Sequence, residues 1–218
     1  MRSVRLVLIS DTHGRHEALS MPEGDVLIHA GDVSERGSLR EVRAFDRFLG
    51  SLRFRHRIVI AGNHDFCFEQ QPAVARQLVT NAIYLEDRSL ELAGVRFYGS
   101  PWQPWFFDWA FNLHRGAPLR AKWDLIPEGT DVLITHGPPM GHGDTTVRGD
   151  RVGCEELAAA VARVRPRLHV FGHIHEGYGQ WSRDGTTFVN ASTCDEVYVP
   201  CNPPVVFDLE VPAGDDTR

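Results

Sequence analysis

Five short apolar runs, each ending abruptly at small or polar residues, constrain the fold of this chain most. They are VRLVLIS before Asp11, DVLIHA before Gly31, HRIVIA before Gly62, DVLIT before His136 and LHVF before Gly172. Uninterrupted runs of Val, Ile and Leu are typical of parallel strands that are covered on both faces. Segments with helical spacing of apolar residues lie between them, at 38–52 and 154–167. This alternation predicts an α/β domain.

Further short strands are expected in pairs. LELAG precedes VRFYGS, the two halves of YGQWSRDGTTFVNAS flank an Asp-Gly turn, and VVFDL follows near the end. Such hairpins indicate a second sheet. A length of 218 residues suits one domain, which we place at 1–211, and the polar residues 212–218 are expected to form a flexible tail.

Charge and composition exclude several classes of function. The formal net charge of -6 argues against a surface that follows a nucleic-acid polymer, which needs an excess of Lys and Arg. The apolar stretch LVLI near the start is too short for a membrane span or a signal segment. The cysteines form no CxxC pair, so reduced thiols and a cytoplasmic location are expected; they are Cys67, Cys154, Cys194 and Cys201.

Every one of the five runs is followed by side chains that can bind a metal ion. In open α/β sheets, ligands bind outside the carboxyl ends of the strands, so donors that are distant in sequence can converge there. The candidate metal ligands are Asp11, His13, Asp32, Asn63, His136, His173 and His175. Within DTH and HIH the two donors are two residues apart, so they point the same way in extended backbone.

The number and type of these donors indicate two metal ions. Seven nitrogen and oxygen donors exceed what one divalent ion usually takes, whereas two ions about 3.5–4 Å apart with a bridging carboxylate would use them all. Imidazole and carboxylate without thiolate suit Zn, Mn, Fe or Ni, and we favour Mn for activity.

The blocks DTH, GD, GNHD, H and GHIH, in this order over residues 11 to 175, resemble the calcineurin-like metallophosphoesterase superfamily. YGSPWQPWFFDWAFNLHRG, THGPPMGHGD and NPPVVFDL resemble its small branch of metallophosphoesterase-domain-containing proteins, so the resemblance covers nearly the whole chain. It implies an α/β fold of four layers, an α/β/β/α sandwich with two mixed sheets, and a dimetal site at the carboxyl ends of the strands.

The resemblance also implies a role for each site residue. Asp11, His13 and His175 would hold one metal, Asn63, His136 and His173 the other, and Asp32 would bridge them. His64 would contact the phosphate and assist the leaving group, with an acidic side chain orienting its ring. Both Glu35 and Asp65 are candidates for that acid. Arg36 stands where related phosphatases have a phosphate-binding Arg, with a plain surface ion pair as the alternative.

Other histidines and an aromatic segment carry weaker signals. We expect structural roles for His29, His169, His56 and His114, while His142 could reach the rim of the substrate site. SPWQPWFFDWAF holds six aromatic residues within ten positions. Most of them should plug the core, and one or two, such as Trp102 or Trp105, could stack on a base.

We therefore expect a dinuclear metal-dependent phosphodiesterase that acts on small nucleotide-type diesters such as 2′,3′-cyclic nucleotides. A metal-bridging hydroxide would attack phosphorus while His64 assists the leaving group. A mononucleotide such as AMP should act as a product-like inhibitor. The alternatives are a phosphomonoesterase or protein phosphatase with the same site, and a catalytically weak binding scaffold.

Overall fold

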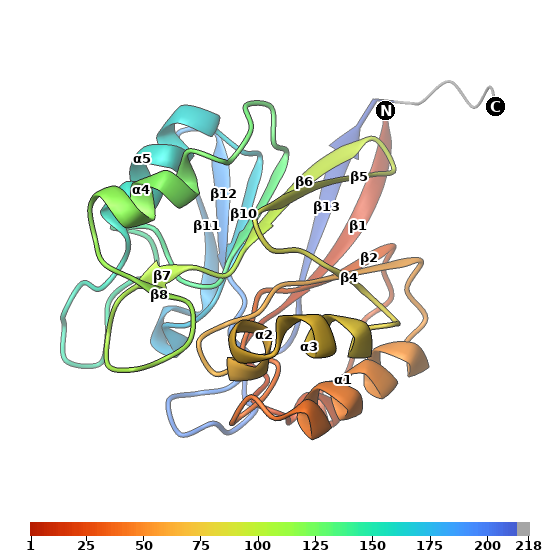
Figure 1. Cartoon of the computed structure of the whole chain (residues 1–218). Coiled ribbons are helices and arrows are strands. Elements are labelled where there is room, and N and C mark those ends of the chain that lie inside the picture. Colours follow the sequence, from red (N-terminus) through yellow and green to blue (C-terminus); the bar gives the residue numbers. More distant parts are fainter. Residues whose placement is uncertain (213–218) are drawn as a thin grey trace.

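Two mixed β-sheets form the centre of the fold in a computed structural model that describes residues 1–212 (Figure 1). The first sheet has the order β13-β1-β2-β3-β4. Strands β1 to β4 run parallel, and β13 pairs antiparallel with β1. The bounds are β1 Arg2–Ile9, β2 Val26–His29, β3 His56–Val59, β4 Ile83–Tyr84 and β13 Val205–Val211.

The second sheet has the order β11-β12-β10-β9-β6-β5. Its four central strands run parallel, and an antiparallel hairpin partner closes each edge. The bounds are β5 Arg88–Leu92, β6 Val95–Ser100, β9 Val132–Thr135, β10 Leu168–Phe171, β11 Gly179–Arg183 and β12 Thr186–Asn190. A small separate pair joins β7 Gln103–Pro104 to β8 Asn112–Leu113.

Helices cover the outer face of each sheet, and the largest core lies between the sheets (Figure 1). Leu6 and Ile28 of the first sheet and Val132 and Val170 of the second belong to this central cluster. The helices are α1 Leu39–Ser51, α2 Phe66–Gln70, α3 Pro72–Leu78, α4 Ala117–Trp123 and α5 Glu155–Val164. Two 3-10 turns, His16–Ala18 and His175–Gly177, complete the elements.

Helix α1 shows why the sequence forms a helix at this position. Ser38 accepts a hydrogen bond from the main-chain nitrogen of Glu41, and the Glu41 side chain accepts one from Ser38 in return. This capping box satisfies main-chain groups that a helix start would otherwise leave unpaired. Phe45 and Leu49 then bury one face of α1 against the first sheet, as the apolar spacing predicted.

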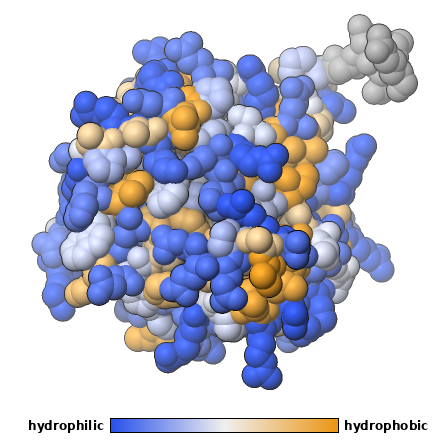
Figure 2. All heavy atoms as spheres, in the orientation of Figure 1, coloured by the Kyte–Doolittle hydropathy of each residue, from blue (hydrophilic) through white to orange (hydrophobic). Residues whose placement is uncertain are grey.

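The predicted fold class is confirmed, because the described chain is a mixed α/β structure with two large mixed sheets. Nearly all of the tail predicted at 212–218 lies outside the described residues, and the bounds of the single domain stay a prediction. Within residues 1–212, none of the helices is both long and apolar enough to cross a membrane. Hydrophilic residues cover most of the face in Figure 2, with scattered hydrophobic patches.

Candidate functional site

Five parallel strands from both sheets deliver the predicted donors to one place. Asp11, Asp32 and Asn63 follow β1, β2 and β3 of the first sheet, while His136 follows β9 and His173 follows β10 of the second. An isolated bridge between Ser10 and Ser192 joins the two sheets at this edge, and the main-chain nitrogen of Thr193 donates to the Ser10 oxygen at 2.9 Å. The edges of the two sheets therefore meet where the donors lie.

One group of donors consists of Asp11, His13 and His175, whose candidate ligand atoms all lie within 4.8 Å of one another. His175 Nε2 lies 3.4 Å from Asp11 Oδ1 and 3.3 Å from His13 Nε2. Asp11 and His13 are buried, as a charged cluster of this kind requires if it is to hold an ion away from water.

The second group gathers around His136. Its Nε2 lies 2.8 Å from Asn63 Oδ1 and 3.4 Å from Asp32 Oδ2, and its ring centroid is 5.0 Å from that of His173. Asp32 Oδ2 also lies 3.9 Å from His13 Nε2 in the first group. Asp32 therefore lies between the two groups, where the sequence placed a bridging carboxylate, and all seven predicted ligands lie in one site.

The hydrogen bonds of two histidines show that this donor set fits cations. The Nδ1 atoms of His175 and His136 lie 2.6 Å and 3.0 Å from the main-chain oxygens of Asp195 and Ala30. A carbonyl only accepts, so each Nδ1 carries the hydrogen and each neutral Nε2 presents a lone pair. These lone pairs face carboxylate oxygens, an arrangement that a proton or a metal cation must neutralise.

The pKa values of the ligand histidines also indicate that the site favours positive charge. Burial lowers the pKa of His136, but the charge and hydrogen bond of Asp32, the charge of Asp11 and the Ala30 main-chain oxygen together raise it to about 9. Burial also lowers the pKa of His175, but the hydrogen bond and negative charge of Asp11, the Asp195 main-chain oxygen and the charge of Asp32 together raise it to about 9. Burial lowers the pKa of His13 to about 4 and that of His173 to about 3, so these rings stay neutral and available as ligands.

Four of the predicted metal ligands have a strained backbone. Asp11, His13, Asp32 and His173 have φ values of 53°, 44°, 57° and 68°, a left-handed region that costs free energy for residues other than Gly. Such strain persists where the surrounding structure enforces it, as at functional sites. Other residues of the described chain, such as Tyr198 and Phe107, also have a positive φ, so the strain at the ligands supports the site together with its geometry.

Two positions next to the ligands require glycine, because a ligand carboxylate lies very close to the main chain there. A Cβ atom at Gly172 would overlap the Asp11 carboxylate, and one at Gly62 would overlap the Asp32 carboxylate. The Gly in GNH and in GHIH is therefore needed because a ligand side chain packs directly against its Cα.

Neighbouring polar groups brace the carboxylates. Ser192 Oγ donates to Asp11 Oδ2 at 2.9 Å, the His173 main-chain nitrogen donates to Asp11 at 3.0 Å, and the His64 main-chain nitrogen donates to Asp32 Oδ1 at 2.8 Å. Ser192 and Asp195, which holds His175, were missed by the sequence reasoning. No local motif marks them, because they come from the chain beyond β12.

The ring of His64 is oriented by a main-chain oxygen instead of a carboxylate. His64 Nδ1 lies 2.7 Å from the Glu35 main-chain oxygen, while the Glu35 side chain lies near Arg15 and Arg36, at 4.0 Å and 3.8 Å. Asp65 is buried and accepts hydrogen bonds from the main-chain nitrogens of Gly62, Val33 and Ser34 and from the Ser34 hydroxyl. Neither predicted acid thus occupies the orienting position.

An apolar-walled cleft adjoins the donor groups. It has a volume of about 530 Å³ and is lined by Glu35, Arg36, His64, Phe66, Phe107, Asp108, Trp109 and Tyr198. A smaller hollow of about 210 Å³ contains Asp32, Asn63, His173 and His175, and it shares His64, Trp109 and Tyr198 with the cleft. Arg36 lies at the rim, with 85% of its side chain exposed. Tyr198 was missed by the sequence reasoning.

The aromatic segment contributes to this cleft through different residues than expected. Trp109 packs on His64 with ring centroids 4.2 Å apart. Trp102 instead donates to Asp87 at 3.0 Å beneath Lys122, and Trp105 stacks on His114. Neither Trp102 nor Trp105, the residues suggested for base stacking, lines the cleft, whereas Phe107 and Trp109 do. Phe111 is buried in the core, as a plug would be.

The remaining histidines lie outside the donor groups. His29 and His169 are buried and contact the hydroxyls of Thr12 and Thr135 at 3.0 Å and 2.9 Å. His142 stacks on Phe188 and accepts a hydrogen bond from Trp181, in a hollow with Arg165 and Arg183. The expectation that His142 could reach the substrate rim finds no support in this placement.

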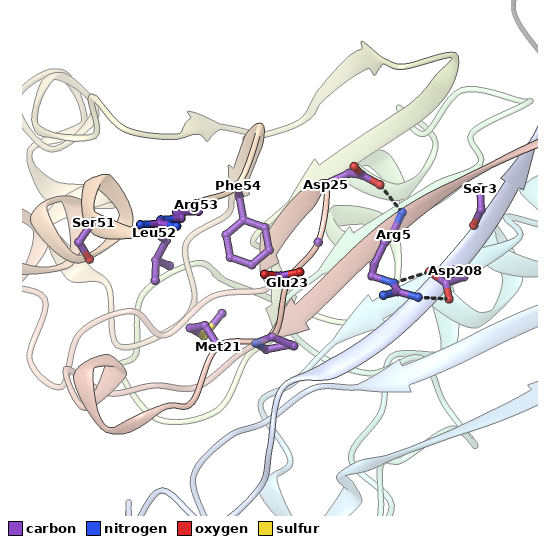
Figure 3. A pocket seen from close by; sticks show the side chains of 12 residues that line it. Ser3, Arg5, Met21, Glu23, Asp25, Ser51, Leu52, Arg53, Phe54 and Asp208 are labelled. Carbon is purple, nitrogen blue, oxygen red and sulfur yellow. Dashed lines mark hydrogen bonds and ion pairs between the residues drawn. The ribbon is translucent and has the colours of Figure 1, made fainter.

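A larger hollow of about 770 Å³ lies at the amino ends of β1, β2 and β3 (Figure 3). Two of its charged side chains pair with each other, since Arg5 binds Asp208 at 2.8 Å. The Asp25 carboxylate accepts from the Arg5 main-chain nitrogen at 2.8 Å. Ligands of α/β sheets bind at the opposite, carboxyl edge. The donor groups and the adjoining cleft are therefore the candidate active site.

Known proteins resemble this chain in sequence. Residues 4–177 match the calcineurin-like phosphoesterase family. Metallophosphoesterase domain-containing protein 1 of Homo sapiens is 51% identical over 233 residues, which cover 95% of this chain and 72% of the relative. A UPF0046 protein of Caenorhabditis elegans is 45% identical over 239 residues, which cover 95% of this chain and 60% of the relative.

Solved structures resemble the fold at low sequence identity. Phosphopantetheinyl hydrolase of Mycobacterium tuberculosis has a TM-score of 0.59 at 17% identity, covering 86% of this chain and 88% of that one. A protein of Thermus thermophilus has a TM-score of 0.58 at 15% identity, covering 87% and 89%. Sequence, fold and the arrangement of the donor loops agree, and the chain belongs to the calcineurin-like phosphoesterase family.

Proposed function

We propose that this protein is a metal-dependent phosphodiesterase of small nucleotide-type diesters, with 2′,3′-cyclic nucleotides as the representative substrates. The observation that carries the proposal is the continuity of the two hollows. The metal-donor hollow and the apolar-walled cleft share His64, Trp109 and Tyr198. A phosphoryl group at the donors would thus extend its organic substituent past His64 and into the cleft.

The walls of the cleft suit a flat heterocycle. Phe66, Phe107 and Trp109 line it together with Tyr198, and stacking of a base on an aromatic ring contributes about 1–3 kcal/mol. Phe107 is 74% exposed, so its ring is free to accept a partner. A nucleoside would fill the cleft better than a simple alkyl group.

The charges around the site favour a diester over a monoester. The described lining residues of the two hollows include the acids Glu35, Asp108, Glu176 and Glu196 against one arginine, Arg36. A phosphodiester carries a single negative charge, whereas a monoester carries nearly two at neutral pH. Repulsion by the acidic rim therefore costs a diester less.

The donor groups would hold two divalent ions, and we favour Mn. Asp11, His13 and His175 form one set, Asn63, His136 and His173 the other, with Asp32 between them. Ions bound there would activate water at neutral pH and neutralise charge on the phosphoryl oxygens. The ligand histidines are held ready for this by the Asp195 and Ala30 main-chain oxygens.

His64 would supply the proton of the leaving group. Its Nδ1 hydrogen is held by the Glu35 oxygen at 2.7 Å, and Trp109 covers one face of the ring. These contacts fix the ring with Nε2 as the atom that is free to hold a proton and transfer it to the departing oxygen. A mononucleotide such as AMP, with its phosphate at the donors and its base in the cleft, would bind as a product-like inhibitor.

A substrate screen tests the proposal. Protein stripped of metal and reloaded with Mn²⁺, Fe²⁺, Zn²⁺ or Ni²⁺ is assayed with bis-p-nitrophenyl phosphate, dimethyl phosphate, 2′,3′-cyclic AMP and AMP. We expect the cyclic nucleotide to exceed the alkyl diester by about 10- to 100-fold in kcat/KM because of stacking. No turnover of any ester with any metal would contradict enzymatic function and favour a binding scaffold.

Variants of two exposed aromatic residues test whether a base stacks in the cleft or whether the loss of any exposed ring has the same effect. Phe107→Ala should reduce the advantage of the cyclic nucleotide and weaken AMP inhibition, since Phe107 lines the cleft. Trp105→Ala is the matched control, because Trp105 is also exposed but stacks on His114. If both variants behave like the wild type, the nucleotide assignment is wrong although phosphodiester hydrolysis can stand.

A further inference from the structure

Tyr198 lies at the boundary between the metal-donor hollow and the cleft, and lines both. Its hydroxyl oxygen lies 3.5 Å from His64 Nε2. Its ring centroid is 4.3 Å from that of His13 and 5.7 Å from that of His64. The hydroxyl therefore lies beside the atom from which the leaving group would receive its proton.

The loop that presents Tyr198 is fixed by the residue that holds a metal ligand. The Tyr198 main-chain nitrogen donates to the Asp195 oxygen at 3.0 Å, and the same oxygen lies 2.6 Å from His175 Nδ1. The Asp195 carboxylate accepts from the main-chain nitrogens of Val197 and Val199 at 3.0 Å and 2.8 Å. Tyr198 itself has a φ of 62°, a strained conformation for a non-glycine residue. Hydrogen bonds to Asp195 thus hold the backbone that presents the Tyr198 side chain next to a predicted metal ligand.

We propose that Tyr198 is a further catalytic residue, whose hydroxyl donates a hydrogen bond to the leaving oxygen beside His64; this inference rests on the hydrolysis proposed above. A separation of 3.5 Å is long for a direct hydrogen bond between the two groups. It suits two donors that share one acceptor, because an oxygen about 2.8 Å from each would sit between them. The cleft and the donor hollow meet at this position.

His64 and Tyr198 have different roles at the leaving oxygen: His64 gives it a proton, and Tyr198 donates a hydrogen bond to it. The bond from phosphorus to that oxygen breaks with its electron pair going to the oxygen, which takes the proton of His64 Nε2. The oxygen of water forms the new bond to phosphorus, and its remaining hydrogens go to the product phosphate and to solvent, from which His64 regains its proton. Tyr198 keeps its own proton and stabilises the negative charge that develops on the leaving oxygen.

Replacement of Tyr198 by Phe isolates the hydroxyl, since the ring that packs on His13 remains. The substrates are 2′,3′-cyclic AMP, whose leaving ribose oxygen is a poor leaving group, and bis-p-nitrophenyl phosphate, whose leaving phenolate needs little stabilisation. We expect Tyr198→Phe to lower kcat/KM about 10- to 100-fold for the cyclic nucleotide and less than about three-fold for the nitrophenyl ester. Metal content and thermal stability should match the wild type.

The matched control is Tyr84→Phe, which removes a hydroxyl that donates to Glu86 at 2.8 Å in another part of the fold. This variant should have the wild-type kcat/KM for both substrates. Three results for Tyr198→Phe would each overturn the role of Tyr198: an equal loss of kcat/KM for the two substrates, loss of metal, or an unchanged kcat/KM for the cyclic nucleotide. The proposed function would still stand in these cases if the wild-type protein hydrolyses the esters. A wild-type protein that hydrolyses neither ester would overturn both.

Discussion

The Nδ1 atom of His64 lies 2.7 Å from the main-chain oxygen of Glu35, in the loop that follows β2. The carbonyl can only accept, so the hydrogen lies on Nδ1 and Nε2 faces the site. A main-chain group therefore does what a carboxylate does in many catalytic sites. This relationship makes the Glu35 side chain dispensable for orienting His64.

Replacement of Glu35 by Ala should consequently leave kcat within about three-fold of the wild type, since its exposed ion pairs contribute little. Asp65→Asn should behave differently, because the buried Asp65 carboxylate accepts four hydrogen bonds that position the GNHD loop. We expect a loss of about 1–3 kcal/mol in the free energy of unfolding, measured by urea denaturation. A large loss of kcat in Glu35→Ala with metals bound would show that its carboxylate orients His64.

His64→Ala should lower kcat by about 10²- to 10⁴-fold while both metals stay bound, which is the usual contribution of a positioned acid or base. The loss should be smaller for nitrophenyl esters than for alkyl esters, because good leaving groups need less protonation. Steady-state kinetics and elemental analysis of the same preparation provide the check. Metal loss would instead make His64 a ligand, a role its nearness to His13 and Asp32 would permit.

Gly172→Ala should weaken metal binding by about 10- to 100-fold, the usual effect of disturbing a residue that supports a ligand. A Cβ at Gly172 would displace the Asp11 carboxylate. Gly137→Ala is the control in the next ligand loop, because its nearest neighbours would be Gln103 and His173 atoms at 3.7 Å and 3.8 Å. Titration with Mn²⁺ followed by calorimetry compares the two, and equal affinities would refute the packing argument.

Metal-reloaded protein should contain two ions per chain, because the donors form two groups that meet at Asp32. Asn63→Ala and His175→Ala change different groups, so each should reduce the metal content toward one. Elemental analysis of dialysed protein gives the stoichiometry. A wild-type value of one, together with full activity in Asn63→Ala, would contradict a dinuclear site.

Stability should fall in acid partly through two buried histidines outside the metal ligands. Burial lowers the pKa of His29 and of His169 to about 3, whereas an unfolded His titrates near 6.5. Between these values the unfolded chain binds protons that the folded chain excludes, so the free energy of unfolding falls as pH falls from about 6.5 towards 3.

The contribution of His169 can be measured by its removal. In metal-free protein, His169→Asn should reduce the slope of unfolding free energy against pH by up to about 1.4 kcal/mol per pH unit between pH 6 and 4. His114→Asn, at an exposed position, is the control and should leave the slope unchanged. Urea titrations at several pH values give the slope, and identical slopes in all three proteins would contradict the neutral, buried state of His169.

The sequence by itself determined the five strands that end at the donor loops. Apolar runs such as the one before Asp11 are local, and the turn residues after them mark the strand ends directly. Because parallel strands align their carboxyl ends at one edge of a sheet, the convergence of Asp11, Asp32 and Asn63 follows from the parallel strands of the first sheet. His136 follows a strand of the second sheet, and only the tertiary structure brings that edge to the first. The hairpins and helix α1 were predicted for the same reason, since their patterns are complete within a short segment.

Only the tertiary structure decided which groups surround His64. The Glu35 carbonyl, Trp109 and Tyr198 come from three loops whose paths depend on distant contacts, such as the Asp195 hydrogen bonds that hold Tyr198. A main-chain oxygen leaves no mark in residue identity, because every residue has one. Choosing Trp109 over Trp102 and Trp105 also required the fold, since all three are equally apolar in sequence and only packing against Asp87 or His114 directs two of them elsewhere.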